Sequence, residues 1–169
     1  MSNSASTTEK GKKGRGRAKL NYLNKGKGTK LPVEFNEKGQ PICKGSTKLS
    51  SFIGTTTREL IPITWKIWKD ISKNFLDGIW EHVQQKFDVD TCHRKYIMQT
   101  MEKIWRDHRS NVLKVINERG KTTGITRAAA LLKPDNVESI EEWQAFVKES
   151  NSQPYKEKSE RFRREQIKP

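Results

Sequence analysis

Basic and amide side chains recur along one predicted helix at a spacing suited to nucleic-acid contact. Those on its polar face are Lys103, Arg106, Ser110 and Lys114, with Arg109 and Asn111 beside them. Lys and Arg neutralise phosphates, while Arg and Asn pair well with guanine and adenine edges in the major groove. The pattern predicts a helix that contacts duplex DNA through this face. Contact with phosphates alone and a merely solvated basic face are the alternatives.

A second basic segment lies at the N-terminus. Residues 1–30 contain nine Lys and Arg against one acid, Glu9, which is +8 of the total charge of +14. With almost nothing to bury, this arm is predicted to be disordered on its own. Its basic cluster consists of Lys12, Lys13, Arg15 and Arg17. We expect a nuclear-import signal or a minor-groove arm there, with a solubilising tail as the alternative, and hence a nuclear location.

Patterns typical of metal binding or catalysis are missing from the sequence. The spacing of His82, Cys92, His93 and His108 contains no C-x-x-C or H-x₃₋₅-H. Gly120-Lys-Thr122 is similar to the end of a phosphate-binding loop, but it closes a predicted helix, and Val115 stands where that loop needs Gly. Acids are scattered, and no Ser/His/Asp or Cys/His arrangement has local support. We therefore expect no catalytic site, metal, cofactor or small-molecule substrate.

Composition indicates a small core with solvated ends. Of the 169 residues, 32% are hydrophobic, and the sequence pI is near 9.9. A core of about 90–100 residues fits these values better than a full-length globule. Cys43 and Cys92 make no disulfide framework, and no secretory or membrane-spanning run is present, so we expect an intracellular protein without a membrane partner.

The predicted elements begin with a short hairpin and continue as helices. Residues 32–43 predict the hairpin, with Gly39 at a positive-φ turn position. Residues 49–63 indicate an extended or short-helical connector. Helices are then expected at 65–74 with Thr64 as N-cap, at 75–87, and from about 91 to 119 with Gly120 as the stop.

The C-terminal third is predicted to contain a linker and further helix. Residues 120–137 indicate a linker with a helical turn at 127–132. Ser139 and Glu142 form a capping-box pattern ahead of Trp143. Residues 155–167 are charged and compatible with a helix, and because that pattern still runs where the chain ends, we expect a fragment or a natural short form. The expected organisation is an arm at 1–30, a domain at 31–119, a linker at 120–137 and a helical segment at 138–169.

Tryptophans mark the successive predicted helices. Four of them are expected to fill the core rather than touch a ligand: Trp65, Trp68, Trp80 and Trp105. This spacing resembles the aromatic cores of small three-helix domains of the Myb/SANT/trihelix type. The predicted fold is therefore mainly α, with such a three-helix domain behind a short β-hairpin.

An ordered set of short segments carries a family resemblance. The segments are Pro32-Val-Glu-Phe-Asn-Glu-Lys-Gly-Gln-Pro41, Ser50-Ser-Phe-Ile-Gly54, Arg58-Glu-Leu-Ile-Pro-Ile-Thr-Trp65, Ile79-Trp80, Lys86-Phe-Asp88, His93-Arg-Lys-Tyr-Ile97, Lys103-Ile-Trp-Arg-Asp107, Glu142-Trp-Gln-Ala-Phe-Val147 and Lys156-Glu-Lys-Ser-Glu-Arg161. Together they resemble the plant transposase-associated family of En/Spm (CACTA) elements. The resemblance implies a nuclear plant protein derived from a DNA transposon. It covers a part of the family without the nuclease core, and the family's longer coiled-coil-prone region is cut short here.

Two classes of function remain open at this point. The first is a DNA-binding module that uses the third helix and the basic arm. The second is a protein-interaction module in which tryptophan-rich helices form a scaffold and the charged C-terminal segment joins a partner or a second copy. An RNA-binding function lacks any RNP-like sequence.

Overall fold

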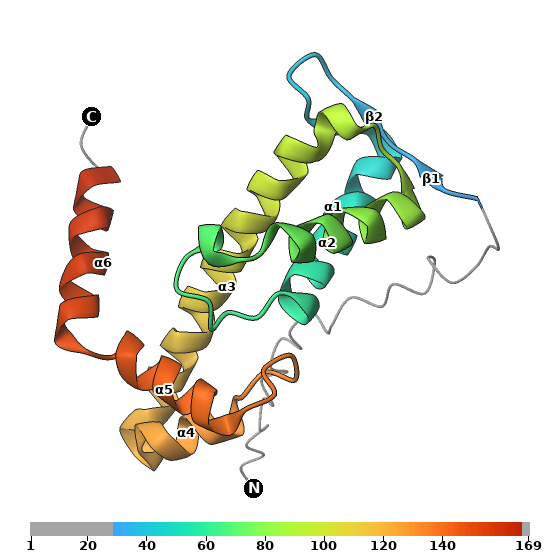
Figure 1. Cartoon of the computed structure of the whole chain (residues 1–169). Helices are drawn as coiled ribbons and strands as arrows, with labels where there is room; N and C mark the ends of the chain where they lie inside the picture. The colour runs from blue at the N-terminus through green and yellow to red at the C-terminus, as the bar shows by residue number, and fades with distance from the viewer. Residues whose placement is uncertain (1–28, 167–169) are drawn as a thin grey trace, which may run out of the picture.

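The computed structural model describes residues 29–166, and over this range the protein is mainly helical (Figure 1). The elements in chain order are β1 (Leu31–Pro32), β2 (Glu34–Phe35), β3 (Pro41–Ile42), α1 (Cys43–Leu60), the 3-10 turn η2 (Trp68–Asp70), α2 (Lys73–Lys86), β4 (Phe87–Asp88), the 3-10 turn η3 (Thr91–His93), α3 (Arg94–Thr123), α4 (Ile125–Leu131), α5 (Ile140–Ser150) and α6 (Gln153–Gln166). The mainly α prediction is confirmed. The arm at 1–28, with its basic cluster, lies outside the described residues.

The predicted hairpin is confirmed. Strands β2 and β3 pair antiparallel, with Phe35 opposite Pro41. The side chain of Asn36 accepts hydrogen bonds from the backbone N–H groups of Lys38 and Gln40, at 3.0 and 2.9 Å. Gly39 has φ of +71°, a conformation in which a side chain is strained. A parallel pair between β1 and β4, which the sequence did not predict, joins residues 31–32 to the segment directly after α2.

The connector predicted at 49–63 is wrong, because most of it belongs to α1. Two glycines and the run Thr55–Thr57 weaken the helical signal, since glycine and β-branched residues are poor helix formers. Burial overrides that propensity. Leu49, Phe52 and Ile53 of α1 are almost fully buried, with Phe52 against the rings of His82 and Phe87, and Thr57 Oγ1 donates to the Ile53 carbonyl at 2.7 Å. Packing energy thus decides the state of this segment.

The helix predicted at 65–74 is also wrong. Residues 61–67 form an irregular segment in which Ile61 and Ile63 alternate inward and are buried. Ser72, and not Thr64, caps the following helix, because its side chain accepts from the Phe75 N–H. Helix α2 then covers most of the predicted span 75–87.

The third helix exists, but it is longer than predicted. Its apolar stripe is confirmed, with Ile97, Met101, Trp105 and Ile116 buried. Gly120 does not stop α3, which continues to Thr123 and ends at Gly124 with φ of +85°. Contacts of α4 with the end of α3 hold this extra turn.

The helical turn predicted at 127–132 is confirmed as part of α4, but the linker predicted around it is wrong at its start, because residues 120–123 are the last turn of α3. Ala128 and Ala129 are buried, and the indole N–H of Trp143 donates to the Ala129 carbonyl at 2.8 Å. Small alanines let α5 approach α4 closely. Helix α5 begins as predicted at Ser139, whose Oγ accepts from the Glu142 N–H.

The predicted tryptophan core is confirmed in part. Trp80 and Trp105 are 4% and 2% exposed, and Trp68 packs partly buried against the core with its ring 5.9 Å from that of Trp105. Trp65 is the exception, because 39% of it is exposed. It lies in the irregular segment 61–67 instead of in a helix that faces the core.

Candidate functional site

The exposed side of α3 is the candidate nucleic-acid interface. This helix has 30 residues, which corresponds to a length of about 45 Å, and it runs diagonally across the molecule in Figure 1. It holds eight Lys and Arg against three Asp and Glu. Its buried side packs on α1, so the polar side is turned to solvent.

Most of the residues predicted to contact DNA lie together on that side. They are exposed: Lys103, Arg106, Ser110, Asn111 and Lys114. At about 100° per residue, four of them form a stripe about 80° wide and about 17 Å long, with Asn111 at its edge. The stripe could follow a groove or a line of phosphates.

Two acidic residues modify the charge of the stripe. Glu102 lies with a carboxylate oxygen 4.0 Å from a guanidinium nitrogen of Arg106. Asp107 is exposed and lies at the edge of the stripe, between Lys114 and Asn111 around the helix axis. A carboxylate repels phosphate but can accept a hydrogen bond from the cytosine amino group. The arrangement is therefore better suited to a groove than to continuous contact with phosphates.

The assignment of Arg109 to the DNA-contacting set is corrected, because its side chain faces the protein. Its guanidinium donates to the carbonyls of Trp65 and Lys66 at 2.6 and 2.8 Å. The guanidinium carbon also lies 4.9 Å from the Phe146 ring centroid and 5.9 Å from that of Tyr155. Burial lowers the pKa of Arg109, whereas Tyr155 and Glu149 act in the opposite direction. Position 109 is on the flank of the helix, where α5 and α6 cover it.

The histidines and cysteines are scattered over the fold. His82 lies 5.2 Å from the Phe52 ring, and His93 stacks on Phe35 at 3.7 Å. Cys43 and Cys92 are exposed and free. Within residues 29–166, no group of three or more His, Cys, Asp or Glu is placed to hold a metal ion. No helix in this range is long and apolar enough to cross a membrane.

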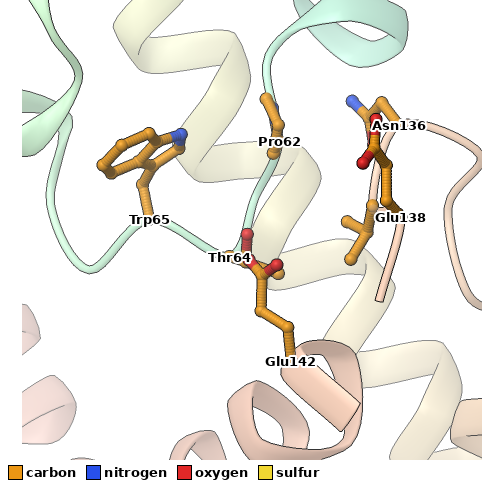
Figure 2. A pocket seen from close by; sticks show the side chains of 7 residues that line it. Pro62, Thr64, Trp65, Asn136, Glu138 and Glu142 are labelled. Carbon is orange, nitrogen blue, oxygen red and sulfur yellow. The ribbon is translucent and has the colours of Figure 1, made fainter. Parts of the chain in front are cut away.

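The sequence reasoning missed an open cleft of about 340 Å³ between the segment after α1 and the segment before α5. We call it the Trp65 cleft; its lining includes Pro62, Thr64, Trp65, Asn136, Glu138 and Glu142. Figure 2 shows Trp65 on one wall, Asn136 and Glu138 on the other, and Glu142 reaching up from α5. A sequence signal existed, since residues 135–149 hold five acids against one Lys in a basic chain.

Comparisons with known proteins add no assignment to this geometry. No protein-family model matches the chain, and no significant match was found to a curated protein or to a solved structure. The resemblance to the plant transposase-associated family therefore stays a prediction.

Proposed function

We propose that the chain is a non-catalytic DNA-binding module of the nucleus, in which α3 and the basic arm contact duplex DNA. The exposed stripe of Lys103, Arg106, Ser110 and Lys114, backed by a packed apolar side, carries the proposal. In this proposal α1, α2 and α3 form a three-helix domain of the Myb/SANT/trihelix type. The resemblance to the plant transposase-associated family supports a transposon-derived origin.

The arm and the helix have different parts in the proposed contact. The arm at residues 1–30 carries +8, and such a charge supplies affinity through counterion release without reading sequence. The side chains of α3 that can reach base edges are Arg106 and Asn111, which suit guanine and adenine. Substitutions in α3 should therefore change the preference for a DNA sequence. Substitutions in the arm should mainly change how strongly binding depends on salt.

The test is a selection of bound sequences from random duplex DNA at physiological salt, followed by binding measurements on variants. Lys103→Glu with Arg106→Glu should abolish the preference for the selected sequence. The matched control is Lys44→Glu with Lys73→Glu, which changes the net charge equally at exposed first-turn positions of α1 and α2. A selection that returns no motif, or a control pair that loses the preference equally, would contradict specific recognition by α3.

A second candidate function, self-association through α6, is favoured by one feature. Beyond its first turn, which holds Tyr155 near Arg109, helix α6 stands apart from the body of the protein in Figure 1, and it has no buried residue. Phe162 on it is 52% exposed, and Arg164 lies 3.9 Å from Glu160 in an i,i+4 ion pair. Charged helices with an apolar position are typical of partner-binding segments. Concentration-dependent sedimentation that Phe162→Ser abolishes would support self-association; a monomer at all concentrations would exclude it.

A further inference from the structure

An apolar hollow lies beside Asn111, where α3 meets the residue that follows α4. Given the proposed contact between α3 and duplex DNA, on which this step rests, we infer that the hollow receives the C5-methyl group of a thymine. Its volume is about 230 Å³. Among the described residues, its lining consists of Asn111, Val112, Val115 and Leu132.

The aliphatic part of the lining is held in a fixed shape. Val112 and Leu132 are partly buried against the core, whereas Val115 is 42% exposed. The Leu132 N–H donates to the Ala129 carbonyl at 3.1 Å, and the same carbonyl accepts the indole N–H of Trp143 at 2.8 Å. A surface that already has its shape loses little conformational entropy when an apolar group enters. Apolar contact of this kind is how side chains recognise the thymine methyl group in the major groove.

Asn111 connects the hollow to the polar stripe of α3, because it lines the hollow and lies at the edge of the stripe. Its exposed amide forms no hydrogen bond with another described residue, and asparagine pairs well with the N6 and N7 atoms of adenine. Val115 follows four residues later, about 6 Å along the helix axis and about 40° around it. Base pairs are about 3.4 Å apart along the duplex, so the two side chains reach positions at most about two base pairs apart.

The charge around the hollow suits a polyanion. From Asn111 to the end of α3, the exposed cations are Lys114, Arg119 and Lys121, against one acid, Glu118. The carboxylate of Glu118 lies 3.1 Å from Nζ of Lys121, which offsets its charge. An aliphatic hollow with a positive border is complementary to a thymine methyl group flanked by phosphates. A protein partner would instead need acidic residues around an apolar contact.

The probe is the duplex obtained from the selection described above, with each thymine of either strand replaced in turn by deoxyuridine. Uracil lacks the C5-methyl group but keeps the O4 acceptor and the pairing with adenine, so the replacement removes the methyl contact alone. Fluorescence anisotropy at physiological salt measures the affinity of the full chain for each duplex. At one thymine the replacement should weaken binding about fourfold, which is the effect of removing one methyl group from an apolar contact.

Two variants locate that contact. In Val115→Ala, the loss caused by deoxyuridine should fall from about fourfold to less than twofold, because one wall of the hollow is shortened. Leu131→Ala is the matched control, since it shortens a side chain that is 68% exposed and adjacent to Leu132 but outside the lining. This control should keep the fourfold loss. Circular dichroism checks that both variants are folded.

Asn111→Ala gives the position of the thymine relative to the adenine. This variant should lose the preference for adenine at one position of the selected sequence. The thymine that responds to deoxyuridine should lie within about two base pairs of that adenine, as the spacing of Asn111 and Val115 requires. A responsive thymine farther away would overturn the assignment to the hollow.

The remaining outcomes separate this site from the proposed function. If the native chain selects a sequence but tolerates deoxyuridine at every thymine, the methyl site is overturned and DNA recognition by α3 stands. A fourfold loss that persists in Val115→Ala, or that falls equally in Leu131→Ala, would also overturn it. If Val115→Ala keeps the loss and abolishes concentration-dependent sedimentation, the hollow is an interface between copies of the chain. A selection that returns no sequence would remove the proposed function together with the methyl site.

Discussion

The guanidinium of Arg109 donates a hydrogen bond of 2.6 Å to the backbone carbonyl of Trp65, 44 residues away along the chain. This bond joins the middle of α3 to the segment after α1. The same guanidinium lies over Phe146 of α5 at 4.9 Å. One side chain therefore connects the N-terminal helices to the C-terminal ones, and its position removes it from the solvent-exposed stripe of α3.

Arg109→Ala should destabilise the protein by about 2–4 kcal/mol, because it removes two charge-assisted hydrogen bonds and the cation–π contacts. Arg109→Lys should recover less than half of that loss, since an ammonium group lacks the planar fork. Urea denaturation followed by circular dichroism measures both. The control is Arg106→Ala at an exposed position, for which about 0.5 kcal/mol or less is expected. Equal losses of stability for Arg106→Ala and Arg109→Ala would contradict this role of Arg109 in joining α3 to the segment after α1.

Asp107→Asn should raise the affinity for non-specific duplex DNA several-fold at low salt. The substitution removes a negative charge, which repels phosphate, from the edge of the exposed stripe without changing the size of the side chain. Fluorescence anisotropy across a salt series is the measurement, and Asp70→Asn in the η2 turn is the matched control, where no change is expected. Unchanged or weaker binding by Asp107→Asn would argue against phosphate contact near the middle of α3.

Two glycine substitutions should act in opposite directions. Gly124→Ala should cost about 1 kcal/mol, because position 124 has φ of +85°, which strains any side chain. Gly78→Ala should instead stabilise by about 0.5–1 kcal/mol, since Gly78 is an exposed position within helix α2 with no atom near an added Cβ. Thermal melts of the two variants, compared with the native chain, give the direction of each change in melting temperature. Two shifts of the same sign would disagree with the helical conformation of Gly78 or with the positive φ of Gly124.

Acidification should destabilise the fold through two histidines. The pKa of His108 is lowered from 6.5 by burial and by the charge of Arg58, and the pKa of His82 is lowered by burial and by Lys86. The unfolded chain therefore binds these protons at a higher pH than the folded chain does. Stability should be full above about pH 7 and fall as the pH drops through the unfolded value near 6.5 toward the lower folded values.

The check on this pH dependence is a series of denaturation curves between pH 5 and 8, a window set by the ordinary histidine pKa. His108→Gln should flatten the slope, and adding His82→Gln should flatten it further. The acids with lowered pKa values, Asp90 and Glu141, titrate below this window. If the dependence of stability on pH is unchanged in the variant that carries both His108→Gln and His82→Gln, it arises from other groups.

Local signals in the sequence determined the hairpin, the cap at Ser139 and the apolar stripe of α3. Each depends on residues within a few positions of one another: Asn36 and Gly39 close a turn, Ser139 meets the N–H of Glu142, and Ile97 recurs with Met101 and Trp105 at helical spacing. Such short-range chemistry is readable before folding because it needs no distant partner.

The tertiary structure alone decided the rest. Helix α1 forms despite weak propensity because Leu49 and Phe52 are buried in the core, where Phe52 packs against His82 of α2 and Phe87 of β4. Helix α3 continues past Gly120 because α4 packs against it. Trp65 is exposed and Arg109 is largely enclosed, the reverse of what their positions in a helical pattern suggest. The Trp65 cleft joins residues more than 70 positions apart. Burial depends on how all the elements pack together. Long-range contacts, and not local spacing, therefore determine which charged side chains face solvent.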